Sequence, residues 1–140
     1  MRRFDSGVKR SPVIAVLDDE PQLRKALRRL LVVHGFAVVT FERGEDVLSA
    51  LAAHPMDCLL LDLRMPEMSG YEVMEGLSAR GISTPVIVLS AHGEPDTDER
   101  VRDLGAAAYL TKPVDETALL SAIAGALSAE STLWNSKLSS

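Results

Sequence analysis

Five short apolar runs, separated by segments of helical periodicity, constrain the fold of this chain more than any other feature. The clearest runs are residues 13–17, 58–61 and 85–89, and two more lie at 36–41 and 107–110. Because apolar and polar residues do not alternate in the clearest runs, these are predicted to be strands buried on both faces. Such strands need helices on both sides, so the sequence predicts a doubly wound parallel α/β fold.

Helices are expected between the strands, where apolar residues recur three or four positions apart. The first begins near Pro21, which suits the first turn of a helix, and ends before Gly35. Right-handed crossovers leave few topologies, and this count of elements fits the flavodoxin-like five-stranded order 2-1-3-4-5. The expected helical segments are 21–34, 45–54, 70–80, 96–104 and 115–127.

Length and composition indicate one domain with irregular ends. The 140 residues, 46% of them hydrophobic, suffice for one core. We expect a disordered arm at 1–11, the domain at 12–128 and a flexible tail at 129–140. A net charge of -5 argues against direct binding of nucleic acid.

The sequence also bears on compartment and redox chemistry. No apolar run approaches membrane-spanning length and no apolar signal region begins the chain, so we expect a soluble, cytoplasmic protein that does not bind membranes. Cys58 is the single cysteine, so no disulfide framework exists and a reducing compartment fits. Its place in an apolar strand is explained more simply by core packing than by a redox role.

Three carboxylates end two strands that are neighbours in the predicted order. Asp18 and Asp19 follow the first strand, and Asp62 follows the third. Ligands of open parallel sheets bind at the carboxyl ends of the strands. Like charges a few ångströms apart repel, so this cluster needs a cation or a raised pKa. Because no His or Cys accompanies the carboxylates, the ligands are hard oxygens and favour Mg²⁺ or a similar ion.

Two further side chains are expected at the same edge. Ser90 follows the fourth strand with a hydroxyl, and Lys112 follows the fifth with an ammonium group. Taken singly, such residues are ordinary helix caps, strand-end hydroxyls or loop lysines. Together with the acidic cluster they suit phosphoryl transfer, with Asp62 as the nucleophile and the metal, Lys112 and Ser90 holding the transferred oxygens.

At these residues the sequence closely resembles the receiver domains of two-component response regulators. The resemblance covers about residues 12–127 and implies a phosphoprotein that takes a phosphoryl group from a histidine kinase or histidine phosphotransfer protein. It implies that phosphorylation then switches a partner-binding face, with dimerisation as one outcome. The motifs that carry it are VLDDEP at 16–21, LDLRMP at 61–66 with Gly70, VLSA at 88–91, GA at 105–106 and YLTKP at 109–113.

The resemblance also implies roles for individual residues. Asp62 would be the phosphoacceptor, and Mg²⁺ would be bound by Asp18, Asp19, Asp62 and the backbone carbonyl of Arg64. The switch pair that reads the phosphoryl group would be Ser90 and Tyr109. The bond between Lys112 and Pro113 would be a cis peptide. Two side chains near the pocket mouth, those of Arg64 and His92, are expected to limit the approach of water.

The output of the domain and two other functions stay open at this stage. The 63–70 loop and residues 91–93 resemble receivers that precede a helix-turn-helix output domain, so the chain is a stand-alone receiver or part of a longer regulator. An Mg²⁺-dependent phosphatase usually carries a second carboxylate two residues after its aspartate nucleophile, but Arg64 occupies that position. An interaction module independent of phosphorylation usually lacks an acidic residue or the lysine, and this chain retains them. We therefore expect catalysis only of its own phosphorylation and dephosphorylation.

Overall fold

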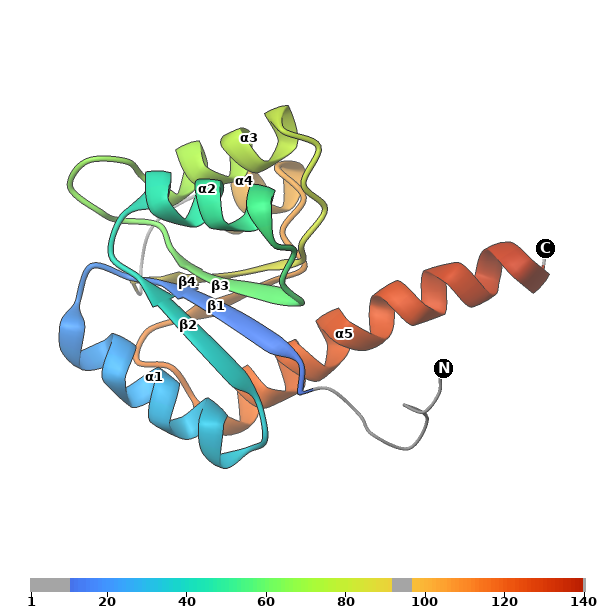
Figure 1. The fold of residues 1–140 in the computed structure, drawn as a ribbon, viewed down its shortest axis with the longest axis horizontal. Helices are drawn as coiled ribbons and strands as arrows, with labels where there is room; N and C mark the ends of the chain where they lie inside the picture. Colours follow the sequence, from blue (N-terminus) through green and yellow to red (C-terminus); the bar gives the residue numbers. More distant parts are fainter. Residues whose placement is uncertain (1–10, 92–96, 140) are drawn as a thin grey trace.

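The computed structural model describes residues 11–91 and 97–139, without the side chains of 98 and 129–139. Within these ranges, five strands alternate with five helices around one sheet (Figure 1). The α/β architecture predicted from the apolar runs is confirmed. The elements are β1 Val13–Leu17, α1 Pro21–Val33, β2 Ala37–Phe41, α2 Gly44–Ala53, β3 Cys58–Asp62, α3 Gly70–Ala79, β4 Val86–Ser90, α4 Thr97–Asp103, β5 Ala108–Thr111 and α5 Glu116–Ser139.

The sheet is parallel throughout and has the order β2-β1-β3-β4-β5. This is the flavodoxin-like order predicted from the sequence. Leu17 of β1 lies opposite Leu61 of β3, so Asp18 follows β1 beside the end of β3. Ser90 of β4 lies opposite Thr111 of β5, which places the start of the following loop at the same edge. The register therefore gathers the predicted site residues along one edge of the sheet.

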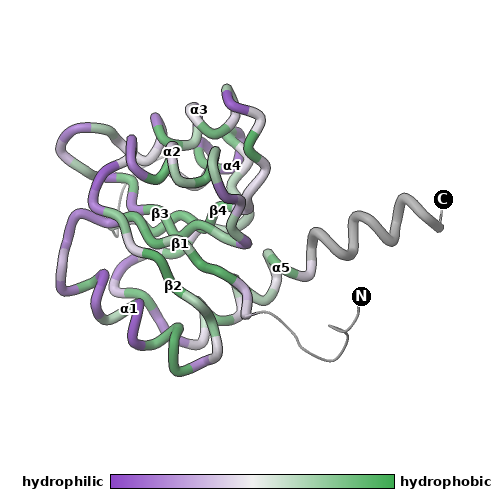
Figure 2. Tube along the Cα trace, in the orientation of Figure 1, coloured by the Kyte–Doolittle hydropathy of each residue, from purple (hydrophilic) through white to green (hydrophobic). Residues whose placement is uncertain are grey.

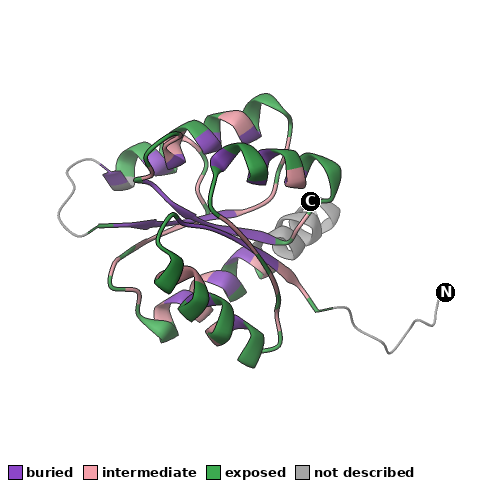
Figure 3. Cartoon of the chain, turned by 60° about the vertical axis from the view of Figure 1, so that its left-hand side comes forward, coloured by how far each residue is buried: buried purple, intermediate pink, exposed green. Residues whose placement is uncertain are grey.

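Two hydrophobic clusters hold the helices against the sheet. One packs α1 and α5 on one face, with Leu31 and Leu119 fully buried. The other packs α2, α3 and α4 on the opposite face, with Val47 and Val73 fully buried. Figure 3 shows the buried strands between the two helical layers, and Figure 2 shows hydrophobic residues along the strands and a mixture of hydrophilic and hydrophobic residues along the helices. Covering both faces explains why the central strands are apolar throughout.

Local signals set where α3 begins, directly beyond the end of β3. The Ser69 hydroxyl accepts a hydrogen bond from the backbone of Glu72, and the Glu72 carboxylate accepts one from the backbone of Ser69. This reciprocal capping box satisfies two backbone donors at the start of the helix. A Cβ atom at Gly70 would lie 2.7 Å from the carbonyl oxygen of Asp62, so glycine permits this close approach of helix and strand.

The last helix is longer than predicted. The sequence placed its end at 127, but α5 continues to Ser139 and runs past the end of the sheet in Figure 1. The prediction failed because it required apolar residues at helical spacing. Residues 128–139 contain no Gly or Pro and include Ala, Leu, Glu and Lys, so their intrinsic helix propensity permits the backbone to stay helical. The side chains of 129–140 and all of residues 1–10 are not described, so the packing of the tail and the disorder of the arm stay predictions.

Candidate functional site

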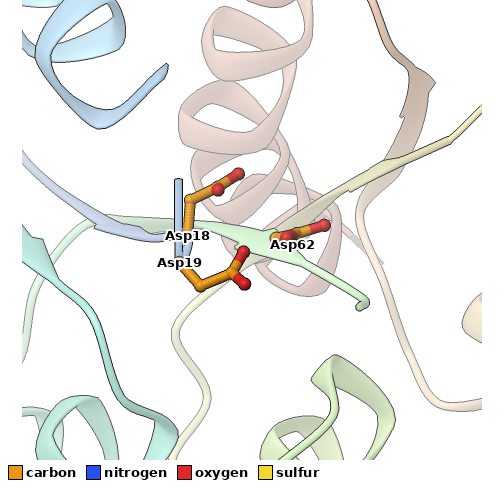
Figure 4. A group of neighbouring side chains, drawn as sticks. All are labelled: Asp18, Asp19 and Asp62. Atoms are coloured by element: carbon orange, nitrogen blue, oxygen red, sulfur yellow. The ribbon is translucent and has the colours of Figure 1, made fainter. Parts of the chain in front are cut away.

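The structure brings together the three carboxylates that the sequence analysis singled out. Asp18 and Asp19 lie at the end of β1, and Asp62 is the last residue of β3 (Figure 4). One carboxylate oxygen from each residue lies within 4.8 Å of the others. Asp18 and Asp62 are buried, with 0% and 4% of their surface exposed, whereas Asp19 is exposed. Two of the three negative charges are therefore largely shielded from water.

Lys112 lies between the two buried carboxylates. Its Nζ atom is 3.2 Å from Oδ2 of Asp18 and 3.3 Å from Oδ1 of Asp62. The bond between Lys112 and Pro113 is cis, as the family resemblance implied. The backbone N–H of Lys112 also donates to the carbonyl oxygen of Ser90, at 2.7 Å. The loop after β5 thus delivers one cation to a site formed by β1 and β3.

Burial and neighbouring charges shift the pKa values of both Asp62 and Lys112. Burial, followed by the neighbouring charge of Asp18, raises the pKa of Asp62 from 3.8 to about 6, although Lys112 partly offsets both effects. Burial alone would lower the pKa of Lys112, but the charges of Asp18 and Asp62 raise it above its ordinary value. Lys112 is therefore protonated at neutral pH, and one ammonium does not fully neutralise the carboxylates around it.

The donor set fits a hard divalent cation. All three carboxylates offer oxygen atoms, and no His or Cys joins them in the clusters found among the described residues. Three carboxylates face a single ammonium group, so the site carries more negative charge than Lys112 compensates. Mg²⁺ prefers a site with few carboxylate ligands and with room for water or phosphate oxygens. Asp18, Asp19 and Asp62 could hold such an ion, and Arg64 as a backbone ligand stays a prediction.

Arg24 is a residue of this site that the sequence analysis missed. Its side chain, only 14% exposed, reaches back from the first turn of α1, and Nη1 donates to the carbonyl oxygen of Asp18 at 2.6 Å. Nη2 lies 3.7 Å from Oε2 of Glu42, at the end of β2. The short separation of Arg24 from Asp18 in the sequence could have revealed this role, because a residue in the first turn of a helix after a strand can reach back to the strand end.

The proposed switch residues lie on β4 and β5. The buried hydroxyl of Ser90 donates to the carbonyl oxygen of Ala91, at 3.4 Å. Tyr109 is half-buried, lies opposite Val88 and packs against the cluster that includes α4. Since Ser90 follows Val88 by two positions on the same strand, Ser90 and Tyr109 share one face of the sheet.

Of the two residues expected at the pocket mouth, only Arg64 is described. The backbone N–H of Arg64 donates to Oδ1 of Asp62 at 3.4 Å, and its exposed side chain lines a surface hollow that also contains Asp19. His92 lies outside the described residues. The place of Arg64 beside the acidic group is therefore established, while the effect of its side chain on water stays a prediction.

The structure also describes the surroundings of Cys58 and the apolar character of the helices. Cys58 is fully buried in β3, and burial raises the pKa of its thiol to about 12. The reactive thiolate is therefore scarce at neutral pH, in keeping with a core residue. Within the described part of the chain, no helix has both the length and the apolar character needed to cross a bilayer.

Comparison with known proteins places this geometry among signalling domains. The family model for the response regulator receiver domain matches residues 14–124. The transcriptional regulatory protein KdpE of Mycobacterium tuberculosis is 46% identical over 102 residues, which are 72% of this chain and 44% of KdpE. FixJ of Azorhizobium caulinodans is 35% identical over 114 residues, which are 81% of this chain and 54% of FixJ. This chain thus spans about half the length of these relatives.

Solved structures give the same result. The crystal structure of FixJ-N superposes with a TM-score of 0.80 at 32% identity, covering 86% of this chain and 96% of that one. The response regulator StyR superposes with a TM-score of 0.76 at 35% identity, covering 93% of this chain and 66% of that one. The similarity extends over most of the present chain but over part of the longer regulator.

Proposed function

This chain belongs to the family of response regulator receiver domains of two-component systems, and from that premise we propose that Asp62 is its phosphoacceptor. The observation that carries the proposal is the position of the Lys112 ammonium between the carboxylates of Asp62 and Asp18. An aspartate that ends a central strand beside a fixed cation is placed to attack an incoming phosphorus and to have the resulting charge stabilised.

In the proposed reaction, a carboxylate oxygen of Asp62 forms a bond to phosphorus while the bond between phosphorus and the donor's imidazole nitrogen breaks. Lys112 would leave its contact with Asp62 and bind an oxygen of the transferred group. The Ser90 hydroxyl would donate a hydrogen bond to another oxygen. Asp18, Asp19 and Asp62 would hold Mg²⁺, with the carbonyl of Arg64 as a further ligand. When bound there, the ion supplies Lewis-acid stabilisation of the phosphoryl oxygens.

Family membership also supports a proposal for the phosphoryl donor and for the output. We propose a histidine kinase or a histidine phosphotransfer protein in the cytoplasm as the donor. Ser90 and Tyr109 would read the phosphoryl group, because they share the face of the sheet that α4 covers. KdpE and FixJ are named transcriptional regulatory proteins, so this receiver would control an output of that kind, with or without a phosphorylation-dependent dimer.

A stoichiometry experiment separates this function from that of a phosphatase with an aspartate nucleophile. Protein would be incubated with acetyl phosphate and Mg²⁺, and covalent phosphate per chain and free phosphate would be followed together. A receiver should approach one phosphoryl group per chain, with release limited by slow hydrolysis of that group. Rapid release of phosphate from several small phosphate esters, without accumulation of phosphoprotein, would show a phosphatase and refute the proposal. Arg64, in place of a second carboxylate, favours the receiver outcome.

A further inference from the structure

Arg24 holds the peptide group that joins the two acidic residues at the end of β1. The carbonyl oxygen that accepts the 2.6 Å hydrogen bond from Nη1 belongs to the peptide between Asp18 and Asp19. The orientation of that peptide fixes the direction in which the chain leaves Asp18 and enters Asp19. A hydrogen bond to this one oxygen therefore affects the positions of both carboxylates.

The rest of Asp18 is held from other directions. Its backbone N–H donates to the carbonyl oxygen of Phe41, at 3.3 Å, and its Oδ1 accepts the N–H of Glu20, at 2.8 Å. The exposed carboxylate of Glu42 lies 3.7 Å from the second guanidinium nitrogen of Arg24, which is an ion pair and not a hydrogen bond. A charged, largely buried donor in a fixed fork geometry makes a stronger and more directional bond than a neutral donor does.

We propose that Arg24 is a positioning residue of the cation site, which sets the affinity for Mg²⁺ by fixing the peptide between Asp18 and Asp19. The inference rests on the proposed metal site and adds a residue to it that binds neither the metal nor the phosphoryl group. Residues that orient the ligands of a metal change affinity by roughly 10-fold to 100-fold when they are replaced. For one hydrogen bond to the backbone, we expect a loss near the lower end, about 10-fold.

The direction in which Mg²⁺ affinity changes when Arg24 is replaced distinguishes a positioning role from a purely electrostatic one. Arg24 carries a positive charge near an acidic site, so its charge alone repels a second cation. Removing the charge without disturbing the peptide would therefore tighten Mg²⁺ binding. Removing an orienting hydrogen bond would weaken it. A weaker affinity in a variant that has lost a positive charge thus points to geometry.

The experiment measures the dissociation constant of Mg²⁺ by titration calorimetry, with the unfolding free energy in chelator measured separately. Arg24→Met keeps most of the apolar stem but removes the donors and the charge. Arg28→Met is the matched control, because Arg28 is an exposed arginine on the next turn of α1 whose Nη1 lies 3.5 Å from the carbonyl oxygen of Val38. We expect about 10-fold weaker binding for Arg24→Met and unchanged or slightly tighter binding for Arg28→Met.

The results that would overturn the role of Arg24 differ from those that would overturn the Mg²⁺ site itself. Wild-type affinity or tighter binding in Arg24→Met would overturn the inference, including the case in which only the unfolding free energy falls. Absence of Mg²⁺ binding by the wild type would overturn the metal site and the inference together. If Arg24→Met does not fold, Arg24→Leu takes its place, since leucine also removes both the hydrogen-bond donors and the charge while suiting a helix. Wild-type affinity in that variant would likewise overturn the inference.

Discussion

The ammonium nitrogen of Lys112 lies 3.2 Å from Oδ2 of Asp18, although 94 residues separate the two in sequence. The contact joins the loop after β5 to the end of β1 across the intervening strands β3 and β4. Since Asp18 is fully buried, its charge depends on this partner for compensation. The same ammonium serves Asp62, so one lysine compensates two carboxylates.

Replacing this lysine should lower stability in the absence of metal. In Lys112→Met, two largely buried carboxylates lose their shared counter-ion, which we expect to cost about 1–3 kcal/mol after allowance for partial exposure of the lysine. Urea unfolding in chelator measures the change. Lys25→Met, at an exposed position of α1, is the control and should stay within about 0.5 kcal/mol of wild type. Equal effects of the two substitutions would show that the site gives Lys112 no special role.

The pKa of Asp62 predicts a pH dependence of the Asp62→Asn substitution. The folded pKa of about 6 exceeds the ordinary 3.8, so the folded chain binds this proton more tightly than the unfolded chain does. The ionisation of Asp62 therefore does not lower the free energy of unfolding below about pH 4. Its cost grows as the pH rises and is complete above about pH 6, where it is at most about 3 kcal/mol.

Asp62→Asn removes that penalty, so it should stabilise the metal-free protein at pH 8 and do so progressively less towards pH 4. The difference in unfolding free energy between variant and wild type, measured in chelator at several pH values, tests this. A difference that does not vary with pH would mean that the carboxyl group titrates alike in the folded and unfolded chains.

Alanine substitutions at two glycines, Gly70 and Gly125, should change stability in opposite directions. At Gly70, a Cβ atom would lie 2.7 Å from the carbonyl oxygen of Asp62 and 2.8 Å from Cα of Leu63, so the backbone beside the site must shift. We expect Gly70→Ala to destabilise by about 1–3 kcal/mol. Gly125→Ala has no heavy atom within 4 Å and lies within α5, so it should stabilise by up to about 1 kcal/mol. Thermal unfolding of both variants measures the contrast; stabilisation by both would show that the strand end adapts freely.

Arg64 is predicted to prolong the phosphorylated state. Its exposed side chain lines the hollow beside Asp19, from which a guanidinium group can pair with phosphoryl oxygens and hinder water. Arg64→Ala should therefore speed spontaneous dephosphorylation while leaving Mg²⁺ affinity nearly unchanged, because the expected metal contact is a backbone carbonyl. His92→Ala should act in the same direction but less. Decay of phosphoprotein after removal of the donor measures both, and equal or slower decay for Arg64→Ala would place its side chain outside the water's path.

Much of this fold was predictable because its strands are buried on both faces. The apolar run at 58–61 predicts a strand that needs helices on both sides of the sheet. Because the crossovers are right-handed, this need leaves few possible strand orders. The carboxylates Asp18 and Asp62 were predictable for the same reason, since parallel strands end at one edge. Lys112 followed once the fifth strand had been placed.

Other features were not predictable because they depend on side-chain reach or on intrinsic propensity. Arg24 looks like one of several arginines on an amphipathic helix, and only its burial and its bond to Asp18 distinguish it. The extension of α5 beyond 127 lacks the apolar periodicity that the prediction required, yet nothing in its sequence interrupts a helix. Local propensity can prolong a helix that tertiary packing has already started.

Chemical mapping of the phosphorylated residue tests the proposed function most directly. After reaction with acetyl phosphate and Mg²⁺, an aspartyl phosphate is reduced by borohydride to homoserine, which peptide mass spectrometry locates. We expect homoserine at position 62, its loss in Asp62→Asn, and its retention in Asp46→Asn, which neutralises an exposed carboxylate on α2. Homoserine at another aspartate, or phosphoprotein formed equally well by Asp62→Asn, would show that Asp62 is not the acceptor.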